Sequence, residues 1–270
     1  MIPQASDFLA ESQALHELLV AIPPNRFDEG TQFKDWTTNG VLQHLHFWNI
    51  AANLSLVDEP RFLVMLEHAL EKMKAGVPMR TFENEYLKGL KGKELLDTWY
   101  ETMQGVADNF VNADPKTRLK WAGPDMSATS SISARLMETW AHGQEVYDHF
   151  GVERINTDGI RNIAHLGINT FGYTYAVRNR QAPQDKPYVK LTAPSGEIWE
   201  WNTPNDNNFV EGDAVEFCQV VTQSRNIADV HLTVVGEVAT EWMSIAQCFA
   251  GNAETPPPPG TRFTQTISNQ

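Results

Sequence analysis

Apolar residues recur at helical spacing through the first half of the chain. A proline pair, Pro23 and Pro24, stops the first helical pattern, Thr37 or Thr38 offers an N-cap for the second, and Gly151 follows the last. The helices are predicted over residues 4–22, 38–56, 59–74, 92–114 and 127–150. Four principal helices with one long crossover predict a four-helix bundle.

Beyond Thr157 the pattern becomes mixed. Strand-like runs on either side of the turn tetrapeptide at residues 193–196 predict a β-hairpin, and alternation over residues 229–236 predicts a further strand. Helices are predicted over residues 158–180, 211–223 and 237–251. We therefore expect a four-helix bundle over residues 1–157, a smaller α+β domain over 158–255, and a proline-rich tail, extended or disordered, over 256–270.

Charge and composition narrow the possible partners. The 270 residues include 21 Lys plus Arg against 34 Asp plus Glu, a formal net charge of -13, which disfavours nucleic acid and anionic membranes. No apolar run approaches the roughly 20 residues that span a bilayer, and no secretory signal pattern begins the chain. Cys218 and Cys248 lie in apolar helical patterns, as reduced buried thiols do. A soluble cytoplasmic protein is expected.

The candidate chemistry lies in the helix around Glu138 and His142. Residues four apart share one helix face, and a carboxylate inside a largely apolar helix is costly unless it is paired or binds a cation. His44 lies within the apolar stripe of the second helix and would supply a third ligand from a second helix. Two imidazoles and one carboxylate suit a divalent metal, zinc above all, with manganese, iron and nickel tolerated. Taken separately, a solvated Glu–His pair and a hydrogen-bonded interior histidine remain the alternatives.

Two segments carry a family resemblance. The segments "WTTNGVLQHLHFW" and "LMETWAHGQEVYD" resemble the metal-binding helices of the DinB-like bundles, particularly the N-terminal domain of the mycothiol-dependent maleylpyruvate isomerase family. Other segments, including "IAHLGINTFGYTYAVRN" and "APSGEIWEW", are similar to a two-domain subgroup across nearly the whole chain. The resemblance implies His44, Glu138 and His142 as metal ligands, with Glu where many relatives have a third histidine, and a sterol-carrier-like C-terminal domain.

The same resemblance implies chemistry with a low-molecular-weight thiol, activated as a metal-bound thiolate. Neither cysteine lies in the ligand segments, so the thiol would have to be diffusible. We expect a thiol-dependent transferase or isomerase acting on a small electrophilic substrate. Two alternative functions remain open. One is a metal-dependent hydrolase that uses metal-bound water, and the other is a non-enzymatic protein that binds a small molecule or lipid and whose metal only stabilises the bundle. A homodimer is also possible.

Three further residues are candidate helpers. Arg135, three residues before Glu138, could bind a substrate carboxylate, and Asp148 could reach the same groove. His165 follows the bundle and could reach the metal pocket from the second domain. For each, an ordinary structural or surface role is the competing interpretation.

Overall fold

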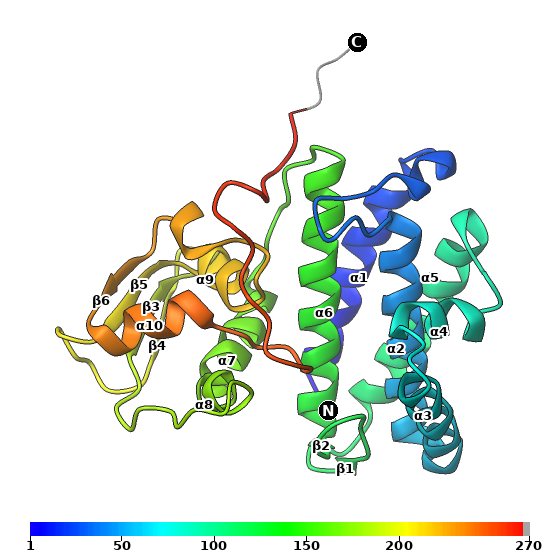
Figure 1. The fold of residues 1–270 in the computed structure, drawn as a ribbon, viewed down its shortest axis with the longest axis horizontal. Coiled ribbons are helices and arrows are strands. Elements are labelled where there is room, and N and C mark those ends of the chain that lie inside the picture. Colours follow the sequence, from blue (N-terminus) through cyan, green and yellow to red (C-terminus); the bar gives the residue numbers. More distant parts are fainter. Residues whose placement is uncertain (267–270) are drawn as a thin grey trace. The chain divides into compact units, whose positions relative to one another are not determined.

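The computed structural model of the chain describes residues 1–266 (Figure 1). It divides into two compact units, one over Met1–Val146 and one from Tyr147 onward. Within residues 1–266, no helix combines the length and the apolar character needed to cross a bilayer. The predicted fold class, a helical bundle followed by a smaller α+β region, is confirmed.

The first unit is almost entirely helical. Its helices are α1 (Gln4–Val20), α2 (Thr38–Val57), α3 (Glu59–Lys74), α4 (Met79–Tyr86), α5 (Gly92–Val111) and α6 (Ala128–His149), of which residues 147–149 already count to the second unit. A 3-10 turn at Pro24–Asp28 and a two-stranded ribbon of β1 (Arg118–Leu119) and β2 (Met126–Ser127) complete the first unit. Thr37 caps α2 by accepting a hydrogen bond from the Gly40 N–H at 3.0 Å, and Asp58 caps α3. The sequence therefore located both helix starts correctly.

Helix α4 was not predicted, and it is anchored by aromatic packing. Phe82 is buried, and its ring packs edge-on against Phe47 of α2 with centroids 5.7 Å apart. Phe62 and Met65 of α3 belong to the same buried cluster. Burial of these apolar side chains holds a helix of only eight residues, too short to be stable alone, against α2 and α3.

The second unit is built around a four-stranded sheet. Its elements are η2 (Asp158–Ile160), α7 (Arg161–Asn169), α8 (Phe171–Ala176), β3 (Tyr188–Thr192), β4 (Ile198–Trp201), β5 (Phe209–Asp213), α9 (Ala214–Val221), η3 (Ile227–Asp229), β6 (Thr233–Val235) and α10 (Glu237–Ile245). The strand order is β4-β3-β5-β6. Strands β3 and β4 form the predicted antiparallel hairpin, β5 runs parallel to β3, and β6 is antiparallel to β5.

Three predicted helices of the second unit differ in extent. The helix over 158–180 breaks at Thr170, whose hydroxyl donates back to the Leu166 carbonyl at 2.8 Å. Residues 211–213 belong to β5, and Asp213 then caps α9. The last helix ends at Ile245 rather than near Gly251, because the chain turns so that the Cys248 N–H can donate to the Val221 carbonyl at 2.9 Å.

Residues 256–266 of the predicted tail form no helix or strand, and they are attached to the second unit by hydrogen bonds. Asn226 Nδ2 donates to the Pro257 carbonyl at 2.8 Å, and Arg262 Nη1 donates to the Gln223 carbonyl at 3.0 Å. The remaining residues of that tail, 267–270, lie outside the described part of the chain.

Candidate metal centre

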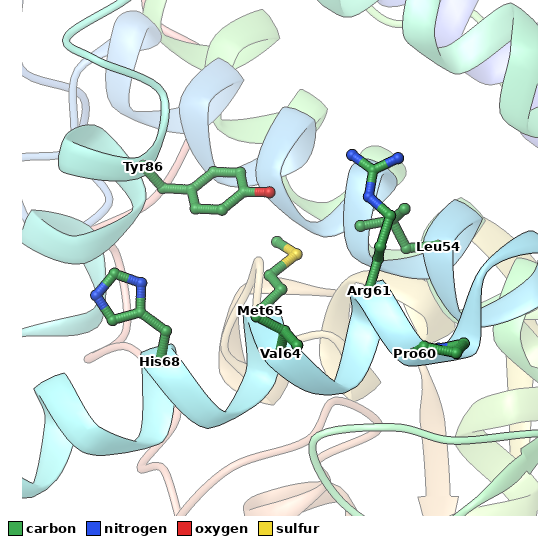
Figure 2. A pocket seen from close by; sticks show the side chains of 7 residues that line it. All are labelled: Leu54, Pro60, Arg61, Val64, Met65, His68 and Tyr86. Carbon is green, nitrogen blue, oxygen red and sulfur yellow. The ribbon is translucent and has the colours of Figure 1, made fainter.

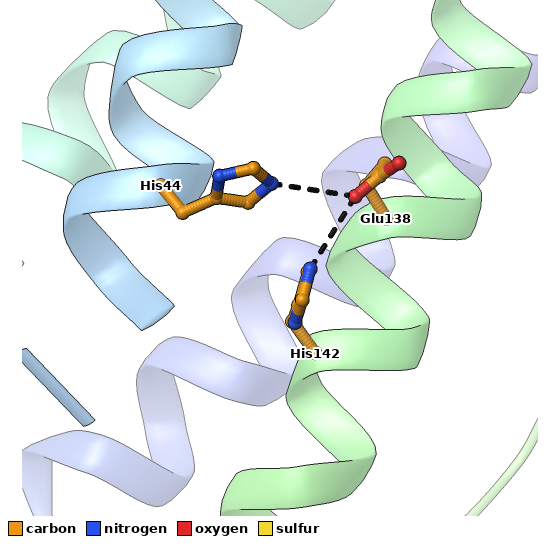
Figure 3. Close-up of side chains that lie close together, drawn as sticks. All are labelled: His44, Glu138 and His142. Atoms are coloured by element: carbon orange, nitrogen blue, oxygen red, sulfur yellow. Dashed lines mark ion pairs between the residues drawn. The ribbon is translucent and has the colours of Figure 1, made fainter. Parts of the chain in front are cut away.

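His44 of α2 and the Glu138–His142 pair of α6 come together in the first unit (Figure 3). Glu138 Oε2 lies 3.5 Å from Nε2 of His44 and 3.4 Å from Nε2 of His142. One ligand atom from each residue lies within 4.8 Å of the others. The side chains of His44, Glu138 and His142 are 17%, 21% and 11% exposed, respectively, so the cluster is partly accessible to solvent.

A second carboxylate stands behind each histidine. Nδ1 of His44 lies 2.8 Å from Oε1 of Glu83, and Nδ1 of His142 lies 3.1 Å from Oε2 of Glu145. A proton held on each Nδ1 leaves the Nε2 lone pair free for a metal, which is the usual arrangement of metal-binding histidines. The donor set therefore fits a divalent ion.

The sequence analysis missed both of these carboxylates. The contact of Glu145 with His142 could have been predicted from the sequence, because residues three apart on a helix are neighbours on its surface. The contact of Glu83 with His44 could not have been predicted in this way, because Glu83 belongs to the unpredicted α4 and lies 39 residues from His44 along the chain.

The electrostatics of the cluster favour charged histidines in the metal-free molecule. Burial opposes charging of His142, but Glu145 and Glu138 outweigh it and raise the pKa of His142 to about 10. For His44, burial is likewise outweighed by Glu83 and Glu138, and its pKa is raised. Burial opposes ionisation of Glu138, yet hydrogen bonds from His142 and His44 hold its pKa well below its usual value. A divalent cation would supply the positive charge that these protons otherwise provide.

Aromatic rings and an arginine border the cluster. Trp36 stacks on His142 with ring centroids 5.2 Å apart and packs edge-on against His44 at 5.4 Å. Phe33 contacts His142 edge-on at 5.4 Å. The guanidinium carbon of Arg80 lies 3.9 Å from the Trp36 ring centroid. None of Trp36, Phe33 and Arg80 was among the predicted site residues.

The three predicted helpers have different surroundings. Arg135 is buried, and its Nε donates to Oδ1 of Asn49 at 3.1 Å. Burial lowers the pKa of Arg135 to about 10, against the opposing effect of Glu138, so it stays charged at neutral pH beside the cluster.

Asp148 and His165 belong to the second unit and bond within it. The guanidinium of Arg225 donates hydrogen bonds to both carboxylate oxygens of Asp148, at 2.6 and 2.7 Å. His165 is exposed on α7, where its Nδ1 accepts from Trp201 Nε1 at 3.2 Å and its Nε2 lies 2.8 Å from Asn169 Nδ2. Asp148 is thus engaged in a buried ion pair, which differs from the groove role considered for it.

A separate cavity of about 370 Å³ lies along α3 (Figure 2). Its lining includes Met65, His68 and Tyr86, and none of the three clustered residues His44, Glu138 and His142. This cavity is therefore distinct from the candidate metal centre.

A helical bundle with a His–Glu–His cluster between two of its helices defines a DinB-like protein with a candidate metal centre. The model of the family "Mycothiol maleylpyruvate isomerase N-terminal domain" matches residues 8–147, and the chain belongs to this family. The resemblance noted in the sequence is confirmed.

Relatives extend the similarity to nearly the whole chain. Two uncharacterized proteins, from two strains of Mycobacterium tuberculosis, are each 36% identical to it over 258 residues, covering 96% of this chain and 97% of theirs. The crystal structure of the mycothiol-dependent maleylpyruvate isomerase aligns with a TM-score of 0.50 and 15% identity, over 80% of this chain and 86% of that one. A histidine-to-alanine variant of that enzyme aligns equally well. At this identity, the structural likeness shows the fold alone.

Proposed function

We propose that this chain is a metal-dependent enzyme, a thiol-dependent isomerase or transferase that joins a low-molecular-weight thiol to a small electrophilic substrate. The observation that carries the proposal is the convergence of His44 Nε2, His142 Nε2 and a Glu138 oxygen at a partly exposed point. Membership of a family named for a mycothiol-dependent enzyme supports the thiol. Zinc is the expected metal for this donor set, with manganese, iron or nickel as substitutes.

Each residue of the centre has a separate task in this proposal. His44, Glu138 and His142 hold the ion, while Glu83 and Glu145 fix the orientation of the two imidazoles. When bound, a divalent ion lowers the pKa of a thiol from about 8.5, so that thiolate is abundant at neutral pH.

The charges around the centre favour an anionic nucleophile once an ion is present. When both imidazoles are neutral, as metal ligation requires, the three carboxylates of Glu83, Glu138 and Glu145 and the two guanidinium groups of Arg80 and Arg135 leave one net negative charge. A divalent ion makes the local charge positive, and this attracts a thiolate in a partly desolvated site.

The chain's own cysteines are poor candidates for the nucleophile. Cys218 and Cys248 are both buried in the second unit, and burial raises the pKa of Cys218 well above its usual value. The nucleophile is therefore expected to come from solution.

The test is metal analysis of the purified protein beside His44→Ala and His142→Ala variants, followed by turnover assays with small electrophiles. Wild type should carry about one equivalent of metal, and both variants should lose it. His68→Ala, at an exposed position on α3, is the matched control and should keep the metal. Equal metal content in all four proteins would contradict the proposed ligands.

The assays also separate the proposed chemistry from its alternatives. Turnover that requires an added thiol supports the proposal. Turnover without any thiol would instead indicate a hydrolase, and stoichiometric metal with no turnover on any electrophile would indicate a metal-braced binding protein.

A further inference from the structure

Arg80 lies beside the candidate metal centre without a partner for its N–H groups. Its guanidinium packs against the Trp36 ring, and Trp36 in turn contacts both His44 and His142. Within residues 1–266, no acceptor receives a hydrogen bond from the Arg80 guanidinium and no carboxylate forms an ion pair with it. A half-buried arginine in this state has unused donors in a site that a ligand can enter.

The sequence makes room for this arginine at Gly40. A Cβ atom added to Gly40 would collide with Nη2 of Arg80, so the guanidinium occupies the space that any larger residue would fill. Gly40 is four residues before His44 on α2, and four residues of an α-helix rise about 6 Å. The guanidinium is therefore placed about one helical turn from the metal-binding face of His44.

The local charges hold Arg80 in its cationic form. Burial lowers the pKa of Arg80, while the carboxylates of Glu83 and Glu145 oppose this effect. These are the same carboxylates that bind Nδ1 of the two histidines, so Arg80 stabilises them electrostatically without a direct bond. Its N–H donors remain available.

We propose that Arg80 binds an anionic group, a carboxylate above all, on the small molecule that enters the metal centre. The guanidinium carbon of Arg80 lies 3.9 Å from the Trp36 ring centroid, and the N–H donors of a guanidinium lie in the plane of the group, where a carboxylate can accept two of them. A separation of about one helical turn suits a small molecule that meets the ion at one end and Arg80 at the other. This inference rests on the proposed function, since it assigns the specificity of the same centre.

The test compares three small probes by titration calorimetry of the zinc-loaded protein. Mercaptoacetate and 2-mercaptoethanol are thiols of similar size, of which only the first has a carboxylate, and malonate has carboxylates without a thiol. Wild type should bind mercaptoacetate about tenfold more tightly than 2-mercaptoethanol, as one charge-assisted contact predicts. Arg80→Met should remove that preference and the malonate binding. The loss of its general positive charge should weaken the binding of both thiols to a similar, smaller extent.

Two further variants control for indirect effects. Gly40→Ala should also weaken the preference, because it displaces the guanidinium while favouring the helical backbone of α2. Arg61→Met, at an exposed position of α3, should behave as wild type. Metal content measured on every variant excludes loss of the centre as the cause.

The outcomes separate this inference from the proposed function. If Arg80→Met still prefers mercaptoacetate over 2-mercaptoethanol as strongly as wild type does, the proposed role of Arg80 is overturned, while the proposed thiol chemistry is not affected. Malonate binding that depends on Arg80, with neither thiol bound, supports the anion site and contradicts the thiol proposal. A wild-type protein that binds none of the three probes overturns both.

Discussion

Glu83 of α4 accepts the Nδ1 proton of His44 of α2 at 2.8 Å, and the same oxygen, Oε1, accepts from Trp48 Nε1 at 3.1 Å. Glu83 is 1% exposed, so this carboxylate is removed from water and its position is fixed by the packing of α4. A short helix that contributes none of the three clustered residues thus sets the orientation of one of them.

Glu83→Gln is therefore expected to weaken metal binding by about 10- to 100-fold, the usual effect of removing the partner of a ligating histidine. The glutamine can still accept from Trp48, so the fold should be retained. Competition with a chelator of known affinity measures the change. Glu85→Gln, at an exposed position on the same helix, is the control and should bind metal as wild type does; equal losses in both variants would indicate damage to α4 instead.

The sequence predicted the parts of the first unit that depend on local signals. Helix α3 has the predicted bounds, Glu59–Lys74, because Asp58 caps it and its apolar residues keep one period. The three residues of the cluster were identified because Glu138 and His142 lie one turn apart and His44 lies in an apolar stripe. Their role as ligands stays a prediction.

Features that depend on distant contacts were not predicted. Helix α4 is held by Phe82 against Phe47, a contact that no local pattern of its eight residues reveals. Strand β5 runs parallel to β3, from which it is separated in the chain by β4, and its last three residues, 211–213, were assigned to a helix. Arg225, which pairs with Asp148, and Trp36, whose ring packs against Arg80, likewise come from remote segments.

Metal binding is expected to release protons. Metal ligation requires neutral imidazoles, but the pKa of His142 is raised to about 10, so in the metal-free protein His142 is charged near neutral pH, and the pKa of His44 is also raised. Calorimetric titration with zinc in buffers of different ionisation enthalpy should show release of at least one proton at pH 7. Apparent affinity should rise from pH 6.5 to pH 8.5; a pH-independent affinity with no proton release would contradict the pKa shifts.

The stability of the metal-free protein should fall in alkaline solution. The folded pKa of His142, about 10, lies above its ordinary value of 6.5, so its charge stabilises the fold fully below pH 6.5, and this contribution is lost as pH rises through about 10. Urea unfolding of chelator-treated protein at pH 7, 8.5 and 10 measures the effect. His142→Gln should show a smaller dependence on pH over this range, and an equal slope in both proteins would assign the effect to other groups.

Asp148→Ala should destabilise the second unit without removing the metal. Arg225 is 9% exposed, and its guanidinium holds both oxygens of Asp148, so the variant leaves a buried charge without its carboxylate at a cost of about 3–5 kcal/mol. Thr264→Val is the matched control, because it removes only one hydrogen bond to the same carboxylate, worth about 0.5–1.5 kcal/mol. Urea unfolding and metal analysis of both variants measure these effects. A stable Asp148→Ala protein whose thiol-dependent turnover is nevertheless lost would restore Asp148 as a catalytic candidate, since the ion pair would then contribute little to folding.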